Sequence, residues 1–466
     1  MENTQRENVL GTAPISKLLR TFAIPSIISM LVNSLYNIVD QIFIGQGVGY
    51  LGNAATNVVF PMTVIVMAFA LLIGDGSASF LSLKLGEKDT NAAQKGVNNG
   101  FSMLIILGAA FLVIGLVFLE PLARFSGATE NVLPYAKEYG GIIAIGYPFV
   151  VIGTGLNSIL RADGRPRVAM ISMVAGAVTN TILDPIFIFV FGWGVQGAAL
   201  ATIIGQALSF AISIFFVTRL KTVKINRQDM KLSGKVAKTV AGYGVSSFVT
   251  QMAITASMLV MNNALVTYGA MSPYGADIPL AALGIVMKVN SILISFVIGI
   301  AVGAQPIIGY NYGSGQLERV KKTLFTTFGI ATIITAVGFV LFQFFPQSII
   351  NLFGQEDAMY NEFAQKCFRV FLMFCILAGF QQVSGVFFQS IGKPIKAAVI
   401  SLSRQILILI PAVLILPRLM GLDGVLWAGP IADISAFTWA APNLCTKYRV
   451  SGGGIVKVSY TAYTML

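Results

Sequence analysis

The sequence predicts an all-α integral membrane protein with twelve transmembrane helices in two pseudo-symmetric six-helix lobes. Composition, the length of the apolar runs and an internal repeat carry this prediction. Of the 466 residues, 56% are hydrophobic and 11% are charged, whereas a soluble domain has about 25% charged residues. Apolar runs of about 20 residues, each able to cross a hydrocarbon core of roughly 30 Å as a helix, recur along the chain. Strands of a β-barrel would instead alternate in segments of about 10 residues.

Short motifs recur along the chain at a spacing of 227 or 228 residues, or very close to it. The pairs are Gly164–Pro166 with Gly392–Pro394, Gly194–Gly197 with Gly421–Gly424, Gly86–Lys95 with Gly313–Lys322, and Gly127 with Gly354. Four pairs at one spacing in so apolar a chain indicate two homologous membrane halves. Duplicated halves are typical of secondary transporters, which open to alternate sides by moving one half against the other.

The spans are the hydrophobic runs between charged residues or Gly, Pro and Asn breaks. In the first half they are predicted at 15–44, 52–83, 95–119, 131–158, 165–191 and 194–219. In the second half they are predicted at 238–268, 279–309, 319–345, 358–388, 394–417 and 421–446. The domains follow as an N-terminal segment 1–14, an N-lobe 15–219, a linker 220–237, a C-lobe 238–446 and a tail 447–466. The apolar stretch from Ile15 is too long for the core of a signal peptide, so we expect it to remain as the first span.

Positive charge is concentrated on one side of the predicted membrane. Most of the 31 Lys and Arg residues lie in the N-terminal segment, the loops after even-numbered spans, the linker and the tail. The opposite loops hold Arg124 and Arg418 and little else. The positive-inside rule therefore places both termini and the linker in the cytoplasm. The net charge of +12 is read as a topology signal, because no soluble basic domain is present to bind nucleic acid.

The chain has no histidine, which excludes Ser-His-Asp catalysis, histidine-ligated zinc and histidine proton relays. Its three cysteines do not form a framework. Cys367 and Cys375 are eight residues apart on one predicted helix, about 12 Å along the axis and too far for a disulfide. Cys445 falls at the end of the last span.

Ionisable residues inside spans are functional candidates, because each costs roughly 2.5–3.5 kcal/mol to insert. The best candidates among them are Asp40, Asp184, Lys288, Arg404 and Asp433. Lys288 either lines a cavity or pairs with Asp433, and Arg404 can extend toward the cytoplasm along the helix surface.

Two of these residues share a depth. Asp40 and Asp184 both lie one or two turns below the outer end of an outward-running span. Asn180 is one turn from Asp184 on the same helix face, and Thr202 reaches a similar level on the next span. Two carboxylates, an amide and a hydroxyl offer hard oxygen ligands for Na⁺ and carboxylates for a proton. Structural alternatives are a helix kink at Asp184-Pro185, a hydrated interfacial Asp40, and a helix-packing role for Thr202.

Further polar and methionine side chains are candidates for a substrate cavity. Individually, each is also explained by interhelical hydrogen bonding or lipid contact, while Met residues adapt to varied apolar ligands. The candidates are Asn33, Tyr36, Asn37, Asn157, Met173, Gln251, Asn262, Met287, Lys288 and Asp433.

These motifs give the chain a specific resemblance to one family. Pro25 and Asp40, the Leu160–Pro166 loop, Asn180-x-x-x-Asp184-Pro185, Gly194–Ala199 with Thr202, and the second-half echoes resemble multidrug and toxic compound extrusion (MATE) transporters over about residues 15–446. The likeness is greatest to bacterial members of the DNA-damage-inducible and multidrug-export type. In those members the residues matching Asp40, Asn180, Asp184 and Thr202 are implicated in coupling to H⁺ or Na⁺. Another branch uses an acidic residue in the seventh helix, where this chain has Gln251, Asn262 and Asn263 but no carboxylate.

The resemblance implies two six-helix lobes around a cavity for amphipathic, often cationic drugs, which are exported in exchange for H⁺ or Na⁺. It implies no cofactor other than the coupling ion, no enzymatic activity and no nucleic-acid partner. We expect a monomer in the plasma membrane of a bacterium, with drugs and toxic organic cations as its small-molecule partners.

Three alternatives remain open. A flippase of the same superfamily, for lipid-linked precursors or polysaccharide, usually has about fourteen spans and a strongly basic N-lobe cavity, whereas the deep N-lobe charges here are acidic. A membrane-embedded enzyme would need a catalytic constellation that the sequence lacks. A channel would conduct without coupling to a gradient.

Overall fold

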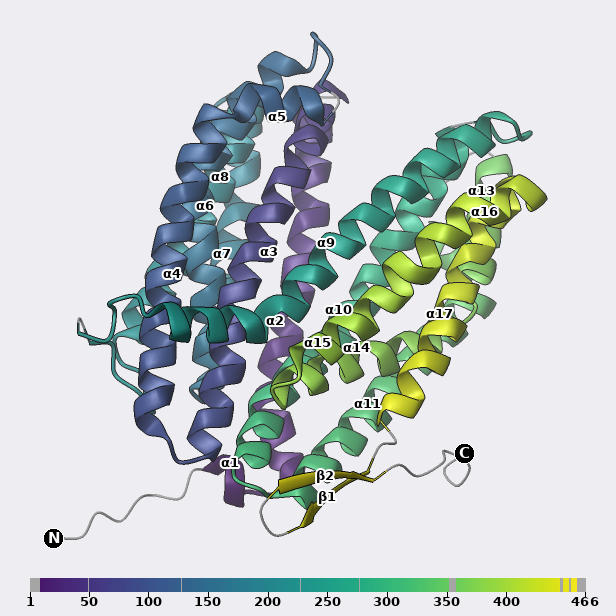
Figure 1. Ribbon diagram of the computed structural model, residues 1–466. Helices are drawn as coiled ribbons and strands as arrows, with labels where there is room; N and C mark the ends of the chain where they lie inside the picture. The colour runs from purple at the N-terminus through teal and green to yellow at the C-terminus, as the bar shows by residue number, and fades with distance from the viewer. Residues whose placement is uncertain are drawn as a thin grey trace, which may run out of the picture. The chain divides into compact units, whose positions relative to one another are not determined.

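The computed structural model describes residues 9–48, 50–126, 128–226, 228–275, 277–351, 358–444, 447–451 and 454–458. Gly127, Gly354 and Cys445, which entered the sequence analysis, lie outside these ranges. The expectation of an all-helical membrane fold is confirmed (Figure 1). The exception among the described residues is an antiparallel hairpin, β1 Lys447–Ser451 and β2 Gly454–Val458, at the C-terminal end.

The helices follow the predicted spans closely. In the first half they are α1 Val9–Thr12, α2 Ile15–Gly47, α3 Tyr50–Gly86, α4 Thr90–Val117, α5 Leu119–Phe125, α6 Leu133–Ala162, α7 Pro166–Pro185, the π-helix η1 Ile186–Val190 and α8 Gly194–Val217. In the second half they are α9 Gly234–Ala270, α10 Asp277–Gly313, α11 Leu317–Phe344, α12 Pro346–Asn351, α13 Ala358–Phe371, α14 Cys375–Ser390, α15 Pro394–Leu402, the π-helix η2 Ser403–Leu409, α16 Ile410–Met420 and α17 Leu422–Leu444.

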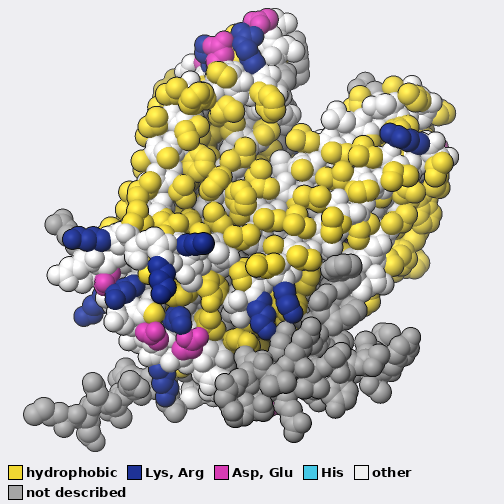
Figure 2. Space-filling view, in the orientation of Figure 1, with side chains coloured by type: hydrophobic (Ala, Val, Ile, Leu, Met, Phe, Trp, Pro, Cys, Tyr) yellow, Lys and Arg dark blue, Asp and Glu magenta, His cyan; other side chains and the backbone are white. Residues whose placement is uncertain are grey.

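Ten of the described helices are long and apolar enough to cross a membrane, and the bent pair α13–α14 makes up to eleven. Helix α17 occupies the twelfth predicted span. In the view of Figure 2, hydrophobic side chains cover most of the helical surface, and most charged side chains lie toward the helix ends. The protein is therefore a multi-pass membrane protein.

Two predicted spans are interrupted. The span 358–388 breaks between α13 and α14 with a bend of 52°, because Met373, Cys375 and Leu377 each donate their backbone N–H to the residue three positions earlier. The span 394–417 contains η2, which lies just before Pro411. Proline has no N–H to donate to the carbonyl of Leu407, and the chain passes this point through a π-helical segment.

The chain divides into two compact units. The first comprises Met1–Thr255, Ile294–Thr327 and Val386–Ile395, and the second comprises Ala256–Leu293, Phe328–Gly385 and Lys396–Leu466. The first unit therefore contains α1 to α8 together with parts of α9, α10, α11, α14 and α15. The lobe boundaries given by the repeat remain a prediction.

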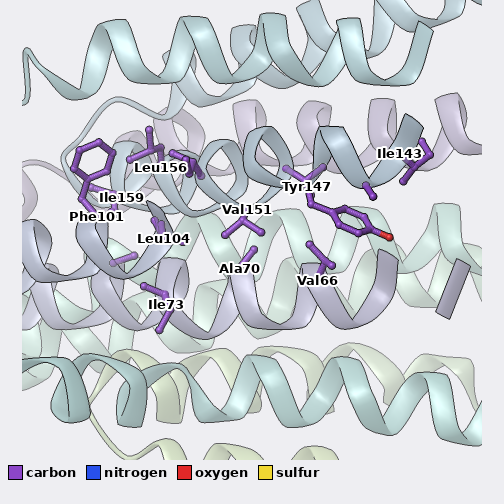
Figure 3. Close-up of a cluster of buried hydrophobic side chains, with 14 of the residues drawn as sticks. Val66, Ala70, Ile73, Phe101, Leu104, Ile143, Tyr147, Val151, Leu156 and Ile159 are labelled. Atoms are coloured by element: carbon purple, nitrogen blue, oxygen red, sulfur yellow. The ribbon is translucent and has the colours of Figure 1, made fainter. Parts of the chain in front are cut away.

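The core of the first unit lies where α3, α4 and α6 pack against one another. Figure 3 shows Val66, Ala70 and Ile73 of α3 beneath side chains of α6 that include Tyr147, Val151 and Leu156. Leu104 of α4 and Leu156 of α6 are fully buried. Helix α8 and then α7 continue this layer from α6, which places the two helices that carry Asn180, Asp184 and Thr202 side by side.

The linker between the halves is bound to the end of α4. Asn98 Nδ2 donates to the carbonyl of Lys224 at 2.9 Å, and Asn98 Oδ1 accepts the amide of Asn226 at 2.8 Å. Asn99 does the same with the carbonyl of Asp229 at 3.1 Å and the amide of Ser233 at 2.8 Å.

A second anchor holds the start of the linker. The carboxylate of Asp163 accepts the backbone amides of Lys221 at 2.9 Å and Thr222 at 2.9 Å, and the Thr222 hydroxyl at 2.7 Å. Two polar residues of α4 and one loop carboxylate therefore hold the linker along most of its length.

Candidate functional site

The predicted acidic layer is assembled by α2, α7 and α8 within the first unit. The carboxyl groups of Asp40 of α2 and Asp184 of α7 interact with each other. Asn180 Nδ2 donates to Asp184 Oδ1 at 3.3 Å and to Thr202 Oγ1 at 3.3 Å. The structure thus brings together all four side chains that the sequence placed at one depth.

A pair of glycines sets the spacing between α7 and α8. A Cβ atom at Gly205 would lie 2.5 Å from the carbonyl oxygen of Gly176 and 3.2 Å from Cβ of Asn180. A Cβ atom at Gly176 would lie 2.7 Å from the carbonyl oxygen of Gly205. Small residues let membrane helices approach this closely, and the approach allows Asn180 to reach the hydroxyl of Thr202.

Pro185 and a π-helical segment mark the C-terminal end of α7. Pro185 follows Asp184 directly and is followed by η1, in which Phe191 donates its amide to the carbonyl of Ile186. The side chain of Ile188 in η1 packs on Gly47 at the end of α2. At Asp184-Pro185 the chain passes from α-helical to π-helical winding, and the contact between η1 and Gly47 joins this part of the chain to α2.

Three buried oxygens at this layer have no hydrogen-bond donor. They are Asp40 Oδ1, Asn180 Oδ1 and Asp184 Oδ2. Asp184 is fully buried and Asn180 is 2% exposed. A buried acceptor without a donor is costly, and these three belong to side chains of one layer, which makes the layer a candidate site for a cation or a proton. Thr202 Oγ1 provides a fourth oxygen beside them.

Two tyrosines border the acidic pair. Tyr36 lies on α2 one turn before Asp40 and interacts with both carboxylates. Tyr139 of α6 interacts with Tyr36 and with the same two carboxylates. Tyr36 was expected in the substrate cavity, and Tyr139 was not predicted as a neighbour of Asp40, because nothing in the local sequence relates a tyrosine on another helix to that residue.

The side chains of the acidic layer limit which ions could bind there. Asp40 and Asp184 form no ion pair with a basic residue in the described part of the chain. Among the described residues no three His, Cys, Asp or Glu side chains gather as they would around a transition metal. Two carboxylates with an amide and a hydroxyl oxygen suit a proton or a hard monovalent cation such as Na⁺.

The remaining cavity candidates fall in both compact units. Within the first unit, Asn157 is 4% exposed and its Oδ1 accepts the Ser213 hydroxyl at 3.1 Å. Asn157 is thus inside a hydroxyl cluster with Ser172 and Ser209. The other candidates of the first unit are Asn33, Tyr36, Asn37, Met173 and Gln251, and those of the second are Asn262, Met287, Lys288 and Asp433.

Asp433 has a different ion-pair partner from Lys288, which was one of the possibilities that the sequence left open. Arg404 Nε donates to Asp433 Oδ1 at 2.7 Å, so Arg404 rather than Lys288 forms the ion pair. Lys288 is exposed. Arg404 lies in η2, whose π-helical winding offsets its side chain from the position that a regular α-helix would give.

Sequence reasoning also missed a polar stripe on α8. Thr202, Gln206, Ser209 and Ser213 recur at intervals of three and four residues, which places them on one helix face. Gln206 Oε1 is buried without a hydrogen-bond partner. The spacing of three and four residues between these polar side chains was the feature of the sequence that could have revealed the stripe.

Comparison with known proteins identifies the family. The MatE family model matches the chain twice, at residues 25–186 and again at 252–414, with starting points 227 residues apart. The two matches repeat the spacing of the internal motifs and cover well over half of the chain. The multidrug export protein MepA of Staphylococcus haemolyticus is 28% identical over 424 residues, covering 90% of this chain and 91% of the relative. MepA of Staphylococcus aureus is 27% identical over 426 residues, covering 90% and 91%.

Solved structures agree. An outward-facing conformation of a multidrug resistance MATE family transporter of the MOP superfamily matches with a TM-score of 0.87 and 25% identity, over 94% of this chain and 97% of that one. A MOP superfamily transporter from Pyrococcus furiosus, described as having a binding pocket of reverse polarity that suggests a different function, matches with a TM-score of 0.85 and 25% identity, over 94% and 98%. The chain therefore belongs to the MatE family: it is a membrane transporter for multidrug efflux and not an enzyme.

Proposed function

We propose that this transporter is an antiporter that exports amphipathic, often cationic compounds by alternating access and couples export to the entry of H⁺ or Na⁺ at Asp40, Asn180, Asp184 and Thr202. The observation that carries the proposal is the convergence of three donor-free oxygens on a buried, unneutralised pair of carboxylates. The resemblance of the chain to multidrug export proteins supports the class of substrate.

Coupling requires that the ion and the drug favour different states of the protein. A cation between Asp40 and Asp184 attracts both carboxylates and holds α2 against α7. Without a cation the two carboxylates repel each other, and this repulsion moves α2 away from α7. Since Tyr36 stands on α2 one turn from Asp40, a displacement of α2 also moves Tyr36 and the neighbouring Asn33 and Asn37. Cation binding is thereby transmitted to side chains that the drug contacts.

Purified protein in liposomes tests the proposal. A fluorescent organic cation such as ethidium is loaded on the side facing the cytoplasmic ends of the helices, and a pH gradient and a sodium gradient are imposed in separate experiments. We expect one gradient to accelerate efflux and the other to leave it near the leak rate, which assigns the coupling ion. Efflux that responds to neither gradient would contradict antiport.

The topology follows from the charge distribution and is part of the proposal. Both termini and the linker are placed in the cytoplasm, and the transporter acts as a monomer in a bacterial plasma membrane. The Lys and Arg residues of the linker support this orientation.

A further inference from the structure

A carboxylate outside the acidic layer connects helices from both halves of the chain. Asp75 lies on α3, eleven residues before its end at Gly86, within the first compact unit. Its Oδ1 accepts the hydroxyl of Ser158 on α6 at 2.7 Å. Its Oδ2 accepts the hydroxyl of Ser247 on α9 at 2.8 Å. One side chain thus bonds a helix of its own half and a helix of the other half.

The network extends one residue further on each side. In the first half, Arg161 of α6 is 8% exposed and its Nη2 donates to Ser158 Oγ at 2.9 Å. In the second half, Gln389 of α14 is 5% exposed and its Nε2 donates to Ser247 Oγ at 3.0 Å. Gln389 Nε2 also lies 3.4 Å from the carbonyl of Tyr243 on α9. Asp75 therefore stands at the centre of a chain of hydrogen bonds from Arg161 to Gln389.

The internal repeat relates the two ends of this chain. Arg161 and Gln389 are 228 residues apart, the same spacing that relates Gly164–Pro166 to Gly392–Pro394. Equivalent residues of the two halves approach the same carboxylate from opposite sides. The two ends of the network therefore come from equivalent positions in the two halves of the sequence.

Close backbone contacts also join α3 to helices of the second half, and we call this contact region the seam. A Cβ atom at Gly76, next to Asp75, would overlap the carbonyl of Val240 on α9, and one at Gly244 would overlap the carbonyl of Leu72 on α3. One turn beyond Asp75, Ser79 is fully buried and its hydroxyl accepts Gln305 Nε2 of α10 at 2.9 Å. Gly86 and Gly313, which are repeat equivalents, pack on each other at the end of α3. The seam runs from Asp75 to the end that carries Lys84 and Lys88.

We propose that Asp75 is the latch of a gate on the cytoplasmic side, holding α3 and α6 to α9 and α14 while the pathway is closed to the cytoplasm. This inference rests on the alternating-access function proposed above. Opening to the cytoplasm then requires the Ser247–Asp75 bond to break, since it is the bond that joins the carboxylate to the second half. The Ser158–Asp75 bond joins two helices of the same half and persists.

The two serines provide a matched pair of variants. Ser247→Ala and Ser158→Ala each remove one hydroxyl from the same carboxylate. Both serines lie inside helices, and Ala has the higher helix propensity. A purely structural role predicts similar effects for both. A latch predicts that only Ser247→Ala favours the state open to the cytoplasm, by about fivefold if one hydrogen bond is lost.

Accessibility of the seam distinguishes these outcomes. The three native cysteines are replaced by serine, and Ser79→Cys is introduced as a reporter inside the seam. Inside-out vesicles are treated with a membrane-impermeant maleimide, which reaches residue 79 only when the cytoplasmic side is open. We expect Ser247→Ala to raise the labelling rate about fivefold and Ser158→Ala to leave it close to that of the reporter chain alone.

Two results would overturn the latch: an unchanged labelling rate in Ser247→Ala, or an equal increase in both variants. Gradient-driven efflux by the unmodified chain is measured in the same vesicles. If that efflux is present while labelling fails to respond, the antiport function stands and the role of Asp75 is wrong. If efflux is absent, the proposed function itself is wrong, irrespective of the labelling.

Discussion

Arg404 and Asp433 form an ion pair of 2.7 Å inside the second compact unit, with side chains 19% and 4% exposed. The pair joins η2 to α17, and Ser257 of α9 donates its hydroxyl to the carbonyl of Gln405 beside it at 3.2 Å. The second half therefore neutralises the buried carboxylate of Asp433 internally, whereas in the described part of the chain Asp40 and Asp184 have no basic partner.

The ion pair predicts that substitutions of Arg404 and Asp433 have non-additive effects on the free energy of unfolding. Asp433→Leu leaves Arg404 without its counter-charge, and Arg404→Met leaves Asp433 unpaired. Each single change should lower the free energy of unfolding by about 3 kcal/mol, while the double variant should recover most of that loss. Thermal unfolding in detergent measures all three. Losses that simply add in the double variant would show that the two side chains do not stabilise each other.

Replacing one member of the acidic pair should stop coupling without unfolding the protein. Asp184→Asn keeps the size of the side chain and its contact with Asn180 but removes a charge. We expect gradient-driven efflux to fall at least about tenfold, within the usual range of coupling between two ligands. Asp423→Asn is the control, because Asp423 is 45% exposed and pairs with Lys366. Full efflux by Asp184→Asn would remove this residue from the coupling site.

The close approach of α7 and α8 is also testable. In Gly205→Ala the new Cβ would lie 2.5 Å from the carbonyl oxygen of Gly176, so the helices must separate and the Asn180–Thr202 bond lengthens. We expect a stability loss of about 1–3 kcal/mol and weaker cation dependence of efflux. Gly329→Ala is the matched control, because nothing lies within 4 Å of a Cβ at that position. Similar behaviour of the two variants would argue against a role for the helix spacing.

The linker contacts predict resistance to protease. Trypsin should cleave slowly after Lys224 and Lys231, because the segments around them are held by Asn98 and Asn99. Asn98→Ala and Asn99→Ala each remove two hydrogen bonds to the linker, worth about 1 kcal/mol each, and each should raise the cleavage rate about tenfold or more. Asn91→Ala serves as the control, since Asn91 is exposed at the start of the same helix. An unchanged rate in both Asn98→Ala and Asn99→Ala would mean that the linker is protected by something else.

The orientation in the membrane can be tested directly. In a cysteine-free chain, Lys231→Cys in the linker should react with an impermeant thiol reagent only in inside-out vesicles. Glu130→Cys, in the exposed segment between α5 and α6, should react only in right-side-out vesicles. The reverse pattern would invert the topology.

The sequence was informative where the relevant interactions are local. Hydrophobic runs located the helices because a spanning helix must satisfy its own backbone hydrogen bonds. Asn180 and Asp184 were related by helix periodicity, and Asp40 and Thr202 joined them because span direction gives an approximate depth. Each of these inferences needs only the chain near the residue concerned.

Interactions between distant segments were harder to predict. The ion pair of Arg404 and Asp433 depends on the π-helical offset at η2, which hydropathy does not report. Asp75 was not singled out as a candidate, although it is an ionisable residue inside a predicted span, because its importance depends on Ser247 and Gln389, which lie far along the chain. The break after α13 arises from local three-residue hydrogen bonds that no proline or glycine signals.

The binding of the linker to α4 and Asp163 also determines what length of the connection between the halves is free to extend. The segment from residue 220 to residue 233 could extend over about 45 Å if it were free. Because the amides and carbonyls from Lys221 to Ser233 are held at several points, almost none of that length is available as a tether. Because the linker is held as far as Ser233, the free connection between the halves is the peptide that joins Ser233 to Gly234. Rotation of α9 relative to α4 must therefore take place about that peptide.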